Sequence, residues 1–167
     1  MALASDQNTL GSRLVYCLYW TDTTPYGTRD TYYGGFILPP DVFVDGKQKG
    51  FRSITSHTIL AGAINGKSGV DLQTSWDGSI LNGTVINTAR KDLDQLVVRV
   101  NRITTADMAS HPNEVTEIIA ELPLAALADG ESDAFTTGSI TLGADERLVV
   151  FVQNDTNKQV FHGAYVP

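Results

Sequence analysis

The chain has 167 residues, of which 42% are hydrophobic, and a formal net charge of −7 at pH 7. This length suits one domain with a single core, and no apolar run approaches the roughly 18 residues of a membrane-spanning helix. Twelve basic residues are scattered among nineteen acidic ones, which argues against nucleic-acid binding because that function needs clustered Lys and Arg.

Residues 1–12 predict a polar N-terminal arm. They lack the basic flank and the long apolar stretch of a secretion signal, and they carry Leu3 and Leu10 among polar residues. We expect a flexible arm that orders on binding, with the two leucines as small anchors; a frayed terminus explains the same composition equally well. Cys17 is the only cysteine, so the chain forms no internal disulfide and suits folding in a reducing cytoplasm.

Short runs rich in β-branched and aromatic residues follow from residue 13 onward, separated by turn signals. Residues 13–20 predict a central strand, and residues 31–38 predict a second strand that two prolines end. Further strands are expected over 52–64 and 67–76, joined by a two-residue turn at Asn65-Gly66. The dipeptide Asp77-Gly78 repeats this turn signal and returns the chain through residues 79–86.

The second half of the chain predicts five more strands, over 95–103, 115–122, 137–142, 147–153 and 159–166. Alternation places Leu96, Val98 and Val100 on one face, with Arg99 and Asn101 on the other. Residues 148–152 are apolar on both faces, which indicates a central strand covered on both sides. Helical periodicity is nearly absent, and only 104–110 and 124–128 suit a turn or two of helix.

About nine or ten strands without intervening helices indicate antiparallel pairing, and this number of strands needs two packed sheets. The sequence therefore predicts an all-β, antiparallel two-sheet β-sandwich, with a jelly roll as the expected form. No repeat or linker divides the chain, so residues 13–167 are expected to form one domain.

Residues that carry chemistry are present without the spacing that builds a site. His57, His111 and His162 lie far apart in the sequence, whereas a metal-binding sandwich delivers two imidazoles from one strand. The chain has no Gly-x-Ser-x-Gly elbow and no phosphate-binding loop. We expect no catalytic residues, metal or cofactor, and predict that the chain is not an enzyme.

Aromatic residues crowd the first forty positions. Tyr32, Tyr33 and Phe36 lie in an uncharged stretch where Gly34 and Gly35 allow another backbone to approach closely. We predict that these aromatic residues anchor a subunit interface, although a strand that fills the core explains them equally well.

Trp76 immediately precedes Asp77-Gly78, and either caps the end of the sandwich or is displayed there. If Trp76 is displayed, it and Tyr26 suit a different function, in which aromatic rings stack on sugars. Coplanar exposed rings along a groove would favour sugar binding, whereas rings buried between subunits would favour assembly.

The segment from Gly69 to Ser79 resembles a strand–turn pattern of tailed-bacteriophage structural proteins, in which a Val-x-Leu-Gln-x-Ser strand enters an Asp-Gly turn. In its small size, acidity and single cysteine, the chain is similar to head decoration (cement) proteins. The resemblance implies a jelly-roll protein, often trimeric, bound outside a capsid at junctions between major capsid proteins. The expected partners are thus the major capsid protein and further copies of the chain, and neither nucleic acid nor membrane. The expected location is the capsid surface of a virion, after synthesis in the host cytoplasm.

The matching stretches cover about a quarter of the chain, and carbohydrate-binding sandwiches use similar hairpins. A carbohydrate-binding module or a lectin-like domain therefore remains the alternative function.

Overall fold

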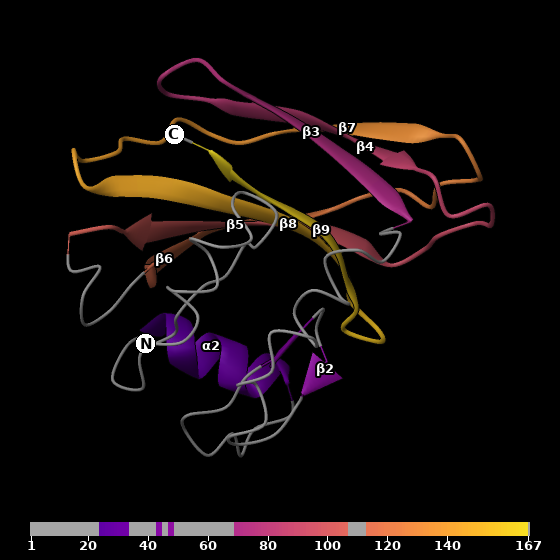
Figure 1. The fold of residues 1–167 in the computed structure, drawn as a ribbon, viewed down its shortest axis with the longest axis horizontal. Coiled ribbons are helices and arrows are strands. Elements are labelled where there is room, and N and C mark those ends of the chain that lie inside the picture. The colour runs from indigo at the N-terminus through magenta and orange to yellow at the C-terminus, as the bar shows by residue number, and fades with distance from the viewer. Residues whose placement is uncertain (1–23, 34–42, 45–46, 49–68, 107–112, 167) are drawn as a thin grey trace, which may run out of the picture.

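The computed structural model describes residues 24–33, 43–44, 47–48, 69–106 and 113–166 (Figure 1). Helix α2 (Thr24–Tyr32) comes first, followed by the short paired strands β1 (Phe43–Val44) and β2 (Lys47–Gln48). The longer strands then follow in chain order: β3 (Val70–Trp76), β4 (Leu81–Asn87), β5 (Leu96–Thr104), β6 (Glu114–Pro123), β7 (Ser132–Thr136), β8 (Glu146–Asn154) and β9 (Val160–Val166).

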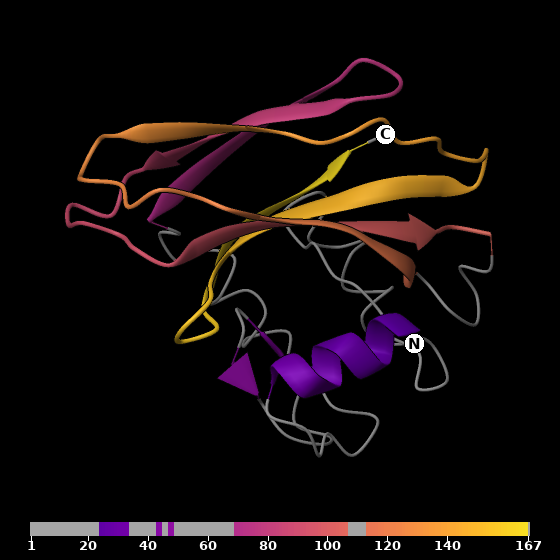
Figure 2. The same cartoon turned by 180° about the vertical axis from the view of Figure 1, so that it is seen from behind.

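These longer strands form two antiparallel sheets that pack face to face, so the predicted all-β sandwich is confirmed. One sheet has the order β3-β4-β7 and the other has the order β6-β5-β8-β9. Figures 1 and 2 show the sheets as two layers, with α2 on the outer side of the four-stranded sheet. Among the described strands, the neighbour order is that of immunoglobulin-like sandwiches, with A-B-E strands in one sheet and G-F-C-C′ strands in the other.

The main core lies between the two sheets. Leu96, Val98 and Val100 of β5 are almost fully buried there, on the face that alternation predicts. A second, smaller cluster lies on the outer face of the four-stranded sheet and includes Val149 and Phe151 of β8. Strand β8 is thus covered on both faces, which confirms the prediction for residues 148–152.

Other strand boundaries differ from the prediction. The expected strand over 137–142 is wrong, because the edge strand is β7 at Ser132–Thr136. Thr137 ends the pairing: its N–H donates to the carbonyl of Leu81 at 2.9 Å, and its hydroxyl accepts from the Leu81 N–H at 3.1 Å. Since Phe135 is the only large apolar residue of β7, the sequence signal for this strand was weak.

The loop after Trp76 is also longer than predicted. Trp76 pairs with Leu81, so four residues connect β3 to β4 instead of two. The Oδ1 atom of Asp77 accepts hydrogen bonds from the N–H groups of Ser79 and Ile80, at 2.8 and 2.7 Å. These bonds, led by the one from Ile80, lower the pKa of the Asp77 carboxyl group below its usual value. Hydrogen bonds to the Asp77 carboxylate, and not a two-residue turn, therefore hold the connection between β3 and β4.

Several predictions lie outside the described residues. These are the arm over 1–12 with Leu3 and Leu10, the strands over 13–20 and 52–64, the turn at Asn65-Gly66, and the positions of Cys17, Phe36, His57 and His111.

A histidine joins the two sheets along one flank of the sandwich. His162 lies on β9, at the edge of the four-stranded sheet, and its Nδ1 atom accepts a hydrogen bond from the Leu72 N–H of β3 at 3.0 Å. The carbonyl oxygen of Val70 lies 3.2 Å from the same ring nitrogen. The imidazole thus occupies the position where a neighbouring strand would bond to the edge of β3.

Gly83 provides a test of the packing between β4 and β7. A Cβ atom at this position would lie 2.6 Å from the carbonyl oxygen of Gln73 and closer still to the ring of Phe135. We predict that Gly83→Ala lowers the free energy of unfolding by about 3 kcal/mol, because the clash involves backbone and a buried ring. Urea unfolding followed by tryptophan fluorescence measures the change. Gly138→Ala is the control, since nothing lies within 4 Å of a Cβ there; equal stability of the two variants would contradict the prediction.

Candidate functional site

Helix α2 depends on its contact with the sheet. It has nine residues, including Gly27 in its interior and several β-branched threonines, and a helix of this length and composition is unstable alone in water. Pro25 suits the first turn, where a backbone N–H has no helical partner to lose. The stability of α2 must therefore come from tertiary contacts, and among the described residues these are with the four-stranded sheet.

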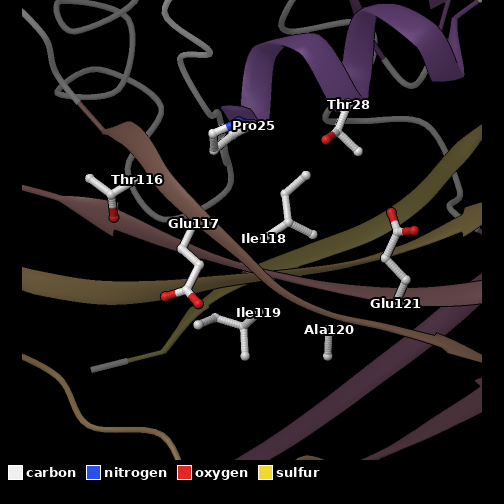
Figure 3. A pocket seen from close by; sticks show the side chains of 8 residues that line it. All are labelled: Pro25, Thr28, Thr116, Glu117, Ile118, Ile119, Ala120 and Glu121. Carbon is white, nitrogen blue, oxygen red and sulfur yellow. The ribbon is translucent and has the colours of Figure 1, made fainter. Parts of the chain in front are cut away.

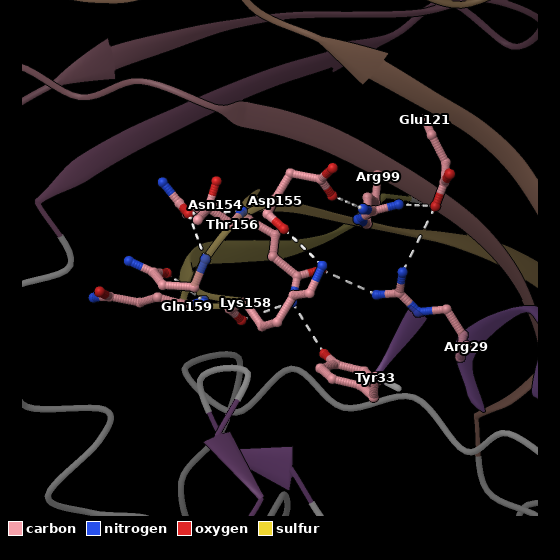
Figure 4. Close-up of polar contacts among 11 residues, drawn as sticks. Arg29, Tyr33, Arg99, Glu121, Asn154, Asp155, Thr156, Lys158 and Gln159 are labelled. Atoms are coloured by element: carbon pink, nitrogen blue, oxygen red, sulfur yellow. Dashed lines mark hydrogen bonds and ion pairs between the residues drawn. The ribbon is translucent and has the colours of Figure 1, made fainter. Parts of the chain in front are cut away.

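Arg29 makes the central contact of α2. Its side chain is buried, with 7% exposed, and its Nη2 atom donates to Oε1 of Gln153 on β8 at 3.1 Å. Its Nη1 atom lies 3.6 Å from Oε1 of Glu121 on β6 (Figure 4). Gln153 is fully buried and donates in turn to the hydroxyl of Tyr33 at 3.0 Å and to the carbonyl of Lys158 at 2.8 Å. The end of the helix is thus bonded to β6 and β8, and Gln153 links β8 in turn to the carbonyl of Lys158.

Arg99 of β5 lies beside this contact and is more deeply buried, with 3% exposed. It forms ion pairs with Glu121 and, at 2.6 Å, with Oδ1 of Asp155 (Figure 4). Both carboxylates remain partly in water while the guanidinium group does not. Since an unpaired buried charge is strongly destabilising, the fold needs both carboxylates to balance the charge of Arg99.

The ring of Tyr32 completes the cluster. The guanidinium carbons of Arg99 and Arg29 lie 4.3 and 4.7 Å from the ring centroid, and Nζ of Lys158 lies 3.5 Å from it. Such contacts between cations and an aromatic face are attractive. The Tyr33 ring stands edge-on to that of Tyr32, with an interplanar angle of 80°. Burial is the main cause that raises the pKa of the Tyr32 hydroxyl above 10.0.

The structure thus corrects the strand predicted over 31–38, since residues 31 and 32 end a helix. The contacts of the two tyrosines with Arg29, Arg99 and Gln153 explain the difference, and propensity alone does not show them. Whether Tyr32 and Tyr33 also contact a partner stays a prediction.

The other candidate aromatic residues lie elsewhere. Trp76 is partly buried and packs against the main core, and whether it also contacts a partner stays a prediction. Tyr26 lies within α2.

Sequence reasoning missed the arginines and Gln153. Arg99 was assigned only to the face opposite Leu96, although it lies in the middle of an apolar run. A charged residue within an apolar strand, such as Arg99, is rarely buried without a partner, and Gln153 lies in a second apolar strand. Together they indicate that polar groups of another element cover the outer face of this sheet.

A shallow groove lies between α2 and the edge strand β6 (Figure 3). It has a volume of about 360 Å³ and is lined by Pro25 and Thr28 of the helix and by residues 116–121 of the strand. Ile118 points to the helix side of β6, whereas Ile119 and Ala120 point to the opposite side (Figure 3). The groove therefore presents apolar side chains on both faces of one sheet edge.

Strand β6 is irregular at this edge. Its pairing with β5 shifts twice, so that Thr116 and Ile119 have no partner in the register. Such bulges bend an edge strand and redirect its side chains, which accounts for Ile119 and Ala120 lying on the same side.

Within the described residues, no three His, Cys, Asp or Glu side chains lie close enough together to hold a metal ion. The same residues include no helix that is long and apolar enough to cross a membrane.

No protein-family model and no curated protein matches this chain. Solved structures that resemble it include a domain of the outer membrane lipoprotein Omp28 from Porphyromonas gingivalis, with 12% identity and a TM-score of 0.37 over 58% of this chain and 84% of that one. β-Glucosidase 3B from Thermotoga neapolitana gives 16% identity and a TM-score of 0.35, over 57% of this chain and 15% of the enzyme. A β-glucosidase from Listeria innocua gives 19% identity and a TM-score of 0.34, over 58% of this chain and 16% of the enzyme. Likenesses this weak carry no functional argument.

Arg29 tests how α2 is held. We predict that Arg29→Ala makes the amide protons of α2 exchange about thirtyfold faster, which corresponds to a loss of about 2 kcal/mol for a hydrogen bond to a charged group. Hydrogen exchange followed by mass spectrometry measures this. Thr31→Ala, on the exposed side of the same helix, is the control and is expected to have little effect. If both variants exchange alike, Arg29 does not hold the helix.

Tyr32 gives a prediction for alkaline pH. An unfolded chain loses the tyrosine proton near pH 10, whereas the folded chain, with its raised pKa, holds it to higher pH. This contribution to stability is complete below pH 10 and is lost as the pH rises through the folded pKa. We expect Tyr32→Phe to lose less stability than the natural chain between pH 9 and 11, as measured by urea unfolding. Parallel curves for the two proteins would refute this.

Proposed function

We propose that the chain works by binding and assembly, as a structural protein that decorates the capsid of a tailed bacteriophage. The observation that carries this proposal is the groove between α2 and β6. It is open and lies along a sheet edge, and it is lined by Ile118, Ile119 and the carboxylates of Glu117 and Glu121. This shape suits a length of protein chain, whereas pockets for small molecules are typically concave and enclose most of the ligand.

The capsid is the proposed partner because of the sequence. The resemblance of residues 69–79 to phage structural proteins, together with the acidic and cysteine-poor composition, supports a contact with a major capsid protein. Trimer formation belongs to the same proposal. An immunoglobulin-like sandwich is compatible with this role but does not imply it, because one fold serves many functions.

The contacts of the aromatic residues weigh against the carbohydrate-binding alternative. A sugar platform needs exposed, coplanar rings. Tyr32 and Tyr33 instead stand edge to face and contact cations of their own chain, and Trp76 packs on the core.

Binding to capsids tests the proposal directly. We expect the purified protein to co-sediment with expanded tailed-phage capsids that lack decoration protein, to saturate at a fixed ratio, and to have the mass of a trimer by light scattering. The same protein should not be retained on immobilised polysaccharides. Retention on polysaccharide without co-sedimentation would replace this proposal with the alternative.

A further inference from the structure

We propose that β6 accepts an added β-strand from the partner protein: an extended segment of about six residues with an apolar centre and a Lys or Arg at each end. This inference rests on the proposal that the chain works by binding other proteins, and it specifies the contact. Strand addition to a sheet edge is a general mode of peptide recognition, in which main-chain hydrogen bonds give affinity and side-chain contacts give specificity.

The edge of β6 is open in the part of the chain that the structure describes. β6 is the last strand of the order β6-β5-β8-β9, and β5 is its only strand neighbour there. Strands expose every second pair of backbone N–H and C=O groups on their outer side. Residues 116–121 line the groove, which sets the length of an added segment at roughly six residues.

The two sides of the groove supply contacts for an added strand. On the helix side such a strand would lie against Ile118, Pro25 and Thr28, and on the other side against Ile119 and Ala120 (Figure 3). Because successive side chains of a strand alternate between faces, a segment with consecutive small apolar residues would pack on both sides at once. Ile119 and Ala120 already pack against the main core and are only partly buried, so an apolar segment would complete their burial, whereas a segment with a polar centre would not.

The charged side chains along the groove indicate which residue types suit the two ends of the added segment. Glu117 and Glu121 lie at the two ends of the groove, and their side chains are 52% and 43% exposed. Their arginine partners lie deeper, with Arg102 23% and Arg99 3% exposed. An approaching chain thus meets carboxylates before guanidinium groups, on a protein with a net charge of −7. A basic residue at each end of the segment fits this arrangement.

A second copy of the chain fits this edge poorly. Antiparallel pairing of two β6 strands about Ile119 would place Glu117 at the same end as Glu121 of the second copy, and like charges at neighbouring positions of paired strands are destabilising. The bulges at Thr116 and Ile119 also remove the flat edge that long self-pairing needs. The geometry therefore favours a short segment of a different, basic chain.

A peptide tests this contact on the natural protein. The probe is acetyl-KVAVVK-amide, and the control is the same peptide with glutamate at both ends. We expect the lysine peptide at saturation to slow hydrogen exchange of amides in β6 by about tenfold, and the glutamate peptide to have no such effect. Equal effects of both peptides, protection confined to another surface, or no binding of the lysine peptide would each overturn the inference.

Two matched variants locate the contact. Thr116 and Thr136 are exposed threonines on edge strands of the two different sheets. We expect Thr116→Lys to weaken binding of the lysine peptide by about tenfold, because it adds a like charge within the groove, and Thr136→Lys to leave it unchanged. Thermal unfolding checks that both variants are folded. Equal binding by the two variants would refute a site at β6.

Capsid binding by the same variants separates this inference from the proposed function. If the natural chain and Thr116→Lys co-sediment equally with capsids, the decoration function stands and the β6 contact is wrong. If the chain ignores capsids but the lysine peptide protects β6, strand addition stands and the capsid is the wrong partner.

Discussion

The burial of Arg99 on the outer face of the four-stranded sheet is the constraint on which this structure depends. A guanidinium group cannot lose its proton at ordinary pH, so its charge has to be balanced where it lies. Glu121 from β6 and Asp155 after β8 provide the balance, and Tyr32 covers the group with its ring. The position of α2 is therefore set largely by electrostatics, whereas the two sheets are held together by their apolar core.

This arrangement links the polar cluster to the groove. Glu121 belongs to both, since it pairs with Arg99 and also lines the groove. Pro25 and Thr28 form the helix wall, and this wall exists only while Arg29 holds α2 on the sheet. Binding in the groove and docking of the helix are thus thermodynamically coupled, because each is favoured by the other.

The sequence predicted the elements whose stability comes from regular burial. Alternation along β5 identified Leu96, Val98 and Val100 as core residues, and the apolar run in β8 identified a strand covered on both faces. It missed elements that depend on contacts distant in the sequence. Residues 31 and 32 have strand propensity but form helix, since partners more than sixty positions away bind Arg29 and Tyr32.

The candidate site was even less accessible to sequence reasoning. Nothing in residues 114–123 distinguishes an open edge from a paired strand, because that difference depends on which strands are neighbours. The aromatic residues, which are the strongest signal for an interface, are used largely within the chain. The groove instead consists of ordinary residues, Ile118, Ile119 and Glu121, brought to one edge by the sheet order.

The histidine contact between β9 and β3 makes the two flanks of the sandwich different. On one flank the His162 imidazole already accepts a hydrogen bond from the backbone of β3. On the opposite flank, β6 has no such contact among the described residues. If strands from other molecules can be added at both flanks of a protein, the assembly can grow without limit. If they can be added at only one flank, growth of the assembly stops. If strands are added at β6 alone, each molecule takes one partner segment at that edge. Growth along the sheet would then stop at a stoichiometry of one to one.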